Sequence, residues 1–240
     1  VLDRELNSWE LHEAATGFRQ GVGIVENARR HCGRPLVVNV DIKGFFPNTR
    51  FPQVLELLHR RLHGRFSPRA VRLLAVVLSY EQALPTGAPT SPALANQILK
   101  STDAALATVA ARKGVTYTRY ADDLTFSSNG RGALEILPFV HERLTELGYE
   151  LDPKKTNVFR KGRRQCVTGL VVNERPNWAK PLRRKLRAAV HRRTQGKTPL
   201  WHGRPIQDHQ LWGLIDFLAQ TQPQEAASLK AQLQTTGARR

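Results

Sequence analysis

The sequence contains no methionine and only two cysteines among its 240 residues. A primary translation product begins with methionine, so we expect the chain to be part of a longer protein. Cys32 and Cys166 lie far apart and form no CxxC pair, which leaves a zinc site without support. Few cysteines are typical of a reducing compartment, and we expect a cytoplasmic setting. No apolar run could span a bilayer and no signal peptide opens the sequence, so we expect no membrane partner.

Acidic residues are also scarce relative to basic ones. The chain has 20 Asp and Glu against 37 Lys and Arg, which gives a net charge of +17. Such a charge favours a polyanionic partner, most simply a nucleic acid. An anionic membrane surface is the rival partner, but the positive charge is spread along the chain and forms no terminal polybasic anchor.

Apolar periodicity predicts a chain of helices and short strands with a subdomain boundary near residue 174. Glycines at 17, 21 and 23 should interrupt the first helical region. Helices are expected within 1–35, with one from Ser8 to Ala15, and at 51–63, 69–80, 93–111, 133–147, 179–194, 206–220 and 224–234. Strands are expected at 36–42, at 115–127 as a hairpin turning at Ala121-Asp122, near 156–160 and at 165–173.

Three aspartates are placed where strands end. Asp41 closes a buried strand, and Asp122 and Asp123 lie at the hairpin turn. Phosphoryl transfer commonly uses two divalent cations about 3.5–4 Å apart, and Mg²⁺ prefers carboxylate oxygens. A lone Asp-Asp pair is more often a solvated turn or a helix cap, so the hypothesis of a metal site depends on all three residues together.

Three segments in order resemble the motifs of reverse transcriptases. TyrAlaAspAsp at 120–123 resembles their [YF]xDD box, AspIleLysGlyPhePhe at 41–46 their preceding aspartate motif, and LeuProThrGlyAlaProThrSerPro at 84–92 the loop between them. The resemblance implies an α+β fold of the right-hand polymerase type, with a palm of antiparallel strands and helices. It implies partial fingers at 1–35, a palm at 36–173 with fingers helices inserted at about 50–83, and a helical thumb at 174–240.

The same resemblance implies a catalytic centre. Asp41, Asp122 and Asp123 would hold two Mg²⁺ ions, with Mn²⁺ as a substitute, and Ile42 would add its backbone carbonyl. Lys155 would protonate the departing pyrophosphate; the alternative is a surface lysine in a turn.

Deoxynucleoside triphosphates are the substrates that the resemblance implies. Phe46 would exclude the ribose 2′-OH as a steric gate, whereas Phe45 would be core. Thr86 and Gly87 would shape the nucleotide pocket, although many reverse transcriptases have Gln where this chain has Thr86. Gly44 likewise stands where Asp or Ser is common.

Two further boxes point to the retron type of reverse transcriptase. AsnAlaArgArgHis at 27–31 resembles the retron NAxxH box, and ValThrGly at 167–169 resembles the VTG box. Retron enzymes use a structured non-coding RNA as template and prime from an RNA 2′-OH to give an RNA–DNA product. The resemblance also implies an anti-phage defence role and allows an effector protein as a partner.

RNA contacts are expected at both boxes, through Asn27 and His31 in the first and through Thr168 and Gly169 in the second. The alternatives are that the NAxxH box braces the palm and that the VTG box is an ordinary β-turn.

The basic helix at 180–193 would be the part of the thumb that grips the template–primer. Arg183, Arg184 and Arg187 are the expected phosphate contacts. A helix at a membrane surface would have a similar pattern. Two alternatives stay open for the whole chain: a group II intron-like or diversity-generating reverse transcriptase, and a non-catalytic RNA-binding scaffold with a polymerase-like fold.

Overall fold

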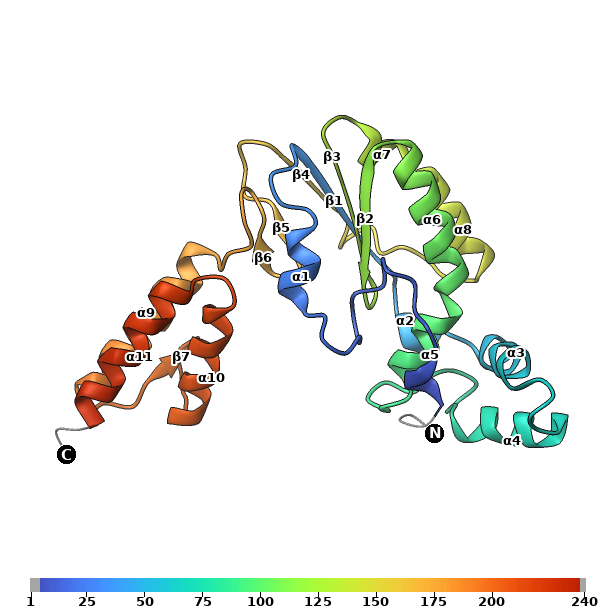
Figure 1. Cartoon of the computed structure of the whole chain (residues 1–240), viewed down its shortest axis with the longest axis horizontal. Coiled ribbons are helices and arrows are strands. Elements are labelled where there is room, and N and C mark those ends of the chain that lie inside the picture. Colours follow the sequence, from blue (N-terminus) through green and yellow to red (C-terminus); the bar gives the residue numbers. More distant parts are fainter. Residues whose placement is uncertain (1–4, 238–240) are drawn as a thin grey trace.

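The structure, a computed structural model, describes residues 5–237, and its centre is a four-stranded antiparallel sheet of order β2-β3-β1-β4 (Figure 1). Its strands are β1 (Leu36–Asp41), β2 (Val115–Tyr120), β3 (Asp123–Ser128) and β4 (Asn157–Arg160). β-Branched residues suit β1 because both of its faces are buried. Val38 and Val40 join one apolar core, whereas Val37 joins a second core on the opposite face.

Helices and a small hairpin cover the two faces of the sheet (Figure 1). The first core packs α6 (Lys100–Arg112) and α8 (Leu137–Glu146) against β1, β2 and β3. The second core joins α1 (Ile24–Arg29) to the hairpin of β5 (Cys166–Val167) and β6 (Leu170–Val171). The sheet is therefore buried between two layers, and only its ends and edges are open to partners.

Two helical regions flank the sheet on opposite sides (Figure 1). One contains the 3₁₀ turn η1 (Leu6–Ser8), α2 (Phe45–Asn48), α3 (Phe51–Leu62), α4 (Pro68–Val77) and α5 (Ser91–Ile98). The other contains α9 (Lys180–Thr194), the hairpin of β7 (Leu200–Trp201) and β8 (Arg204–Pro205), α10 (Asp208–Ala219) and α11 (Pro223–Gly237). Among the described residues, none of the helices has the length and apolarity needed to cross a membrane.

The sequence predicted most of this architecture. The α+β class, strand β1, the β2–β3 hairpin turning at Ala121-Asp122, and helices α3, α4, α9, α10 and α11 are confirmed to within a few residues. The helix predicted from Ser8 to Ala15 is wrong. The segment pairs with the sheet instead: Arg119 N donates to Ala14 O at 2.7 Å, and Thr16 N donates to Arg119 O at 2.8 Å. Tertiary pairing outweighs helix propensity here.

Three predicted elements are divided in the structure. The helix expected at 93–111 breaks at Leu99 into α5 and α6, and that at 133–147 breaks into α7 (Gly132–Glu135) and α8. The strand expected at 165–173 is the β5–β6 hairpin, because Thr168 and Gly169 have φ values of 45° and 83° and reverse the chain. Positive φ at both central residues is the signature of a type I′ turn. Helix α2 and the β7–β8 hairpin were not predicted.

Candidate active site

The three aspartates meet at one end of the sheet. Asp41 ends β1 and lies opposite Asp123, the first residue of β3, while Asp122 occupies the hairpin turn. Ile42 N donates to Asp122 O at 3.0 Å, which fastens the turn to the chain that follows Asp41. Asp41 is buried and the other two are partly buried. The fold therefore brings together carboxylates that are about 80 positions apart in the sequence.

The carboxylates influence one another electrostatically. Burial, followed by the charges of Asp122 and Asp41, raises the pKa of Asp123 to about 6. Burial and the charge of Asp41 also raise the pKa of Asp122, against the opposing effects of a backbone hydrogen bond and of Lys155. The site thus concentrates negative charge in a strongly basic chain.

Lys155 lies directly at these carboxylates. Its Nζ is 2.9 Å from both Asp41 oxygens, and its hydrogen bond with Asp41 and that residue's charge raise the pKa of Lys155. The turn is held by Asp152, which accepts from Lys154 N at 2.9 Å and whose own N donates to Asp41 O at 2.8 Å. The lysine predicted from sequence is therefore fixed beside the aspartates, and its role as a proton donor stays a prediction.

The donor chemistry of this end of the sheet suits a hard divalent cation. In residues 5–237, no three His, Cys, Asp or Glu side chains form a ready-made metal site. The three aspartates nevertheless supply the carboxylate oxygens that Mg²⁺ prefers, and their mutual repulsion is what a cation would relieve.

A buried ion pair supports the turn that carries Asp122. Arg119 Nε and Nη2 donate to the two oxygens of Asp103 at 2.9 and 2.7 Å, and both side chains are 1% exposed. Arg119 Nη1 donates to Asn96 Oδ1 at 2.9 Å and to Ala121 O at 3.0 Å. Ala121 has a φ of 59°, a left-handed conformation that is uncommon for a residue with a side chain. The arginine therefore holds the carbonyl of the one strained residue in the turn.

Gly17 packs against the same turn. A Cβ added to Gly17 would lie 2.4 Å from Ala121 N, a distance that real Cβ atoms do not reach. Asn96 Nδ2 donates to Gly17 O at 3.0 Å, so Gly17 and Arg119 share Asn96 as a partner. Sequence reasoning missed this support, although a charged residue inside an otherwise uncharged strand, at Arg119, was a signal that could have found it.

The residues predicted to bind the nucleotide come from helix α2 and from the loop that precedes α5. Phe45 is buried against Tyr149, whereas Phe46 is partly exposed and stacks on Phe45 with centroids 5.3 Å apart. Thr86 and Gly87 are exposed in a loop that is joined to this region, because Leu84 N donates to Thr49 O at 3.0 Å. The gate at Phe46 and the nucleotide contacts of Thr86 and Gly87 stay predictions.

The NAxxH box is buried in the protein. His31 places Nδ1 2.8 Å from Ser127 Oγ and Nε2 2.7 Å from Thr118 Oγ1, so it bridges strands β3 and β2. Burial lowers the pKa of His31 to about 3. Asn27 accepts from Thr16 Oγ1 at 2.9 Å. Both box residues are fully buried, which favours the bracing alternative over direct contact with RNA.

The two boxes meet in space. Asn27 Nδ2 donates to Thr168 Oγ1 at 3.5 Å, and Thr168 Oγ1 lies 3.4 Å from Ile24 O. Thr168 is partly exposed and Gly169 is exposed at the tip of the β5–β6 hairpin. Of the four box residues predicted to contact RNA, only Thr168 and Gly169 are therefore accessible.

The three thumb arginines differ in their surroundings. Arg183 and Arg187 both pair with Glu225 of α11, with contacts of 2.7 and 2.9 Å. Arg184 is exposed and has no ion pair within the described residues. Arg184 is thus the member of the trio that is free to bind phosphate.

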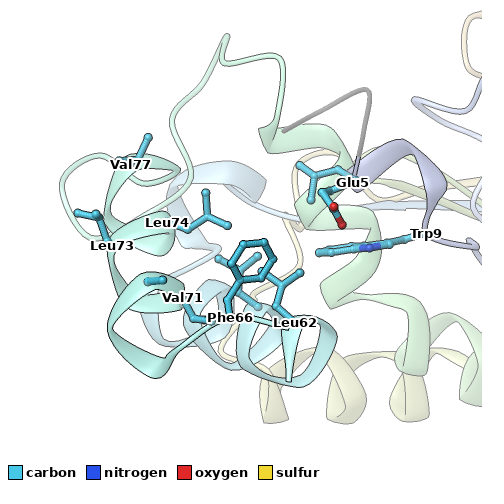
Figure 2. Close-up of a pocket in the computed structure, with 11 residues that line it drawn as sticks. Glu5, Trp9, Leu62, Phe66, Val71, Leu73, Leu74 and Val77 are labelled. Atoms are coloured by element: carbon cyan, nitrogen blue, oxygen red, sulfur yellow. The ribbon is translucent and has the colours of Figure 1, made fainter. Parts of the chain in front are cut away.

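A separate apolar pocket lies between η1, α3 and α4 (Figure 2). Its volume is about 380 Å³, and Trp9, Leu62, Phe66 and Leu74 are among the residues that line it. None of the sequence-predicted site residues contributes to this pocket.

Comparisons with known proteins agree with the motifs. The chain is 38% identical to the retron Mx162 reverse transcriptase of Myxococcus xanthus, over 97% of this chain and 54% of that protein. It is 36% identical to the retron Mx65 reverse transcriptase of the same organism, over 90% of this chain and 53% of the relative. The retron Ec86 reverse transcriptase of Escherichia coli is 31% identical, over 82% of this chain and 62% of the relative. The chain thus spans a little over half the length of these relatives.

A solved telomerase structure from Candida albicans aligns with a TM-score of 0.48 at 10% identity, over 60% of this chain and 30% of that one. The family model described as "Reverse transcriptase (RNA-dependent DNA polymerase)" matches residues 2–183, which is about three quarters of the sequence. The chain therefore belongs to the reverse transcriptase family.

Proposed function

We propose that the protein is an RNA-directed DNA polymerase that extends a primer from the end of the sheet where the aspartates meet. The observation that supports this most is the pairing of Asp41 with Asp123 beside Asp122, in a basic chain of this family. A non-catalytic scaffold would have no need to keep Asp122 and Asp123 beside Asp41, whose charge helps to raise the pKa of both.

Each group of residues in the site has a separate proposed role, and the first group binds metal ions. Asp41, Asp122 and Asp123 would hold two Mg²⁺ ions, with the Ile42 carbonyl as a further ligand. Reverse transcriptases generally use divalent metal ions, and bound ions would supply charge neutralisation at the attacking and leaving oxygens. Mn²⁺ would serve as a substitute.

The remaining site residues act on the nucleotide and the leaving group. Lys155, held beside Asp41, would give a proton to pyrophosphate as it departs. Phe46 would close the space next to the sugar against a 2′-OH, while Phe45 supports its ring from the core. Thr86 and Gly87 would border the deoxynucleoside triphosphate, and the φ of 89° at Gly87 favours glycine in that loop.

Replacing both turn aspartates tests this proposal. Asp122→Asn with Asp123→Asn should abolish primer extension and leave the fold intact, because both side chains are partly exposed and the substitution relieves repulsion. Asp152→Asn is a matched control at a neighbouring carboxylate that holds the Lys155 turn, and should retain measurable synthesis. Normal extension by the double variant on an annealed primer would contradict the assignment.

We further propose the retron type, in which a structured non-coding RNA is both template and source of the priming 2′-OH. Similarity to retron enzymes supports it, as does the contact between the NAxxH and VTG boxes. Thr168 and Gly169 would contact the RNA, whereas Asn27 and His31 would position the hairpin that carries them. A bacterial cytoplasmic setting, an anti-phage role and an effector partner belong to the same proposal.

Two substrates distinguish priming from elongation. Gly169→Ala should impair synthesis that starts on a folded cognate RNA more than extension of an annealed DNA primer. Gly203→Ala is the matched control, since Gly203 is another exposed hairpin glycine with a positive φ of 79°. Equal loss in both reactions would mean that the VTG turn serves only folding.

A further inference from the structure

The last residue of β4 and the four residues that follow it form an exposed basic turn. Four of its five residues are basic, and all five are exposed: Arg160, Lys161, Gly162, Arg163 and Arg164. None of the four basic side chains forms an ion pair with any residue between 5 and 237. The exposed Glu174, which follows β6, does not pair with them either. The positive charge of this segment, which we call the basic turn, is therefore fully available.

The backbone of the basic turn is fixed by the palm. Lys161 N donates to Pro35 O at 2.7 Å, and Asn173 Nδ2 donates to Arg163 O at 2.8 Å. The buried Gln165 adds a hydrogen bond to Arg34 O at 2.9 Å. A segment ordered in this way loses little backbone freedom when it binds a partner, so its charges are pre-organised.

The basic turn lies at the end of the sheet opposite the aspartates (Figure 1). In the register of β1 with β4, Arg160 lies opposite Leu36, whereas Asp41 closes the other end of β1. The five residue steps from Leu36 to Asp41 span about 17 Å. β4 is an edge strand, and no other strand covers its outer side. This outer side runs from Lys155, which lies beside the aspartates, to the basic turn.

We propose that the basic turn is a second RNA contact, which binds the phosphate backbone of RNA that extends past the catalytic end of the palm. The inference rests on the proposed polymerase function and adds a partner surface to it. Arginine presents a planar fork of donors that matches phosphate oxygens, and three of the four basic residues are arginine. The turn contains no apolar or aromatic side chain that could enter a lipid layer, which disfavours a membrane.

Charge neutralisation with a matched control tests the surface. One variant carries Arg160→Gln, Arg163→Gln and Arg164→Gln. The control carries Arg60→Gln, Arg69→Gln and Arg72→Gln on α3 and α4, which are also exposed arginines without ion pairs in the described chain. Both variants lose the same charge. Each is titrated with a short RNA–DNA primer–template, with a probe that has the same primer end and a longer RNA duplex, and with phosphatidylserine vesicles, at several salt concentrations.

The basic-turn variant should bind the long probe roughly tenfold or more weakly, with a salt slope reduced by about one per lost phosphate contact. Its affinity for the short probe, its extension rate on that probe and its melting temperature should match those of the unsubstituted protein. Equal weakening in the control, unchanged affinity for the long probe, or loss of vesicle binding alone would overturn the inference. Failure of the proposed function is distinguishable, because the unsubstituted protein would then not extend the short probe at all.

Discussion

The buried pair of Arg119 and Asp103 offers a sharp test of how the turn that carries Asp122 is supported. We consider Asp103→Leu, Arg119→Met and the double variant. Each single substitution leaves one charge at a position that is 1% exposed. Breaking a buried pair in this way typically costs about 3–5 kcal/mol, a large share of the roughly 5–15 kcal/mol that stabilises a domain. Removing both charges leaves no unpaired ion, so the double variant should be no less stable than either single variant.

Urea unfolding of the four proteins measures the free energies of unfolding. The interaction free energy from the double-mutant cycle should reach at least about 2 kcal/mol, because the residues share two hydrogen bonds of 2.9 and 2.7 Å. Burial lowers the pKa of Arg119, but the charge of Asp103 outweighs that effect and raises it, so the arginine stays charged at every accessible pH. Single variants that cost under about 1 kcal/mol, or free energies that add within about 0.5 kcal/mol, would refute the reasoning.

The double variant also separates folding from catalysis. It lacks the Arg119 donor to Ala121 O and to Asn96, so the turn that carries Asp122 should lose its fixed position. We expect a folded protein with greatly reduced primer extension. The loss should fall mainly on kcat, because neither residue faces the nucleotide. Full activity in a stable double variant would show that the turn holds its conformation without this support.

Three further substitutions test other parts of the structure. Gly17→Ala should reduce extension strongly, because the new Cβ meets Ala121 N, whereas Gly23→Ala has open space and should be neutral in the same assay. His31 is neutral in the folded protein because its pKa is about 3, whereas it gains a proton near pH 6.5 in the unfolded chain. The free energy of unfolding should therefore fall by up to about 1.4 kcal/mol for each pH unit below 6.5. His31→Gln should flatten that pH dependence, measured by urea unfolding. Phe46→Val should raise ribonucleotide relative to deoxynucleotide incorporation, measured as a ratio of kcat/KM values.

Local patterns predicted the elements whose contacts are local. The run of β-branched and apolar residues in β1 and the poor strand formers Ala121 and Asp122 between β-branched runs were sufficient to place the strand and the hairpin turn. The family motifs then indicated which strand ends meet. The helix predicted from Ser8 to Ala15 failed because its backbone bonds with Arg119, more than 100 positions away. No local pattern reports such a partner.

The retron boxes show a different limit of sequence reasoning. A polar residue in a motif can bind a ligand or can form hydrogen bonds with another buried polar group. The residue type alone does not distinguish these two roles. His31 uses both ring nitrogens on Thr118 and Ser127, which are themselves buried in strands. Only the three-dimensional positions show that these groups satisfy one another. Of the four box residues predicted to contact RNA, only Thr168 and Gly169 are exposed enough to do so.

At the candidate active site, features that destabilise the fold are offset by interactions of neighbouring residues. Three carboxylates at one end of the sheet repel one another, and the turn that carries Asp122 holds Ala121 in a left-handed conformation, so both features destabilise the folded chain. The interactions that offset them lie on the opposite side of the turn, where Arg119 and Asp103 are buried together and Gly17 allows the backbone to approach. Substitutions in this support should therefore reduce catalysis without removing any group that touches substrate.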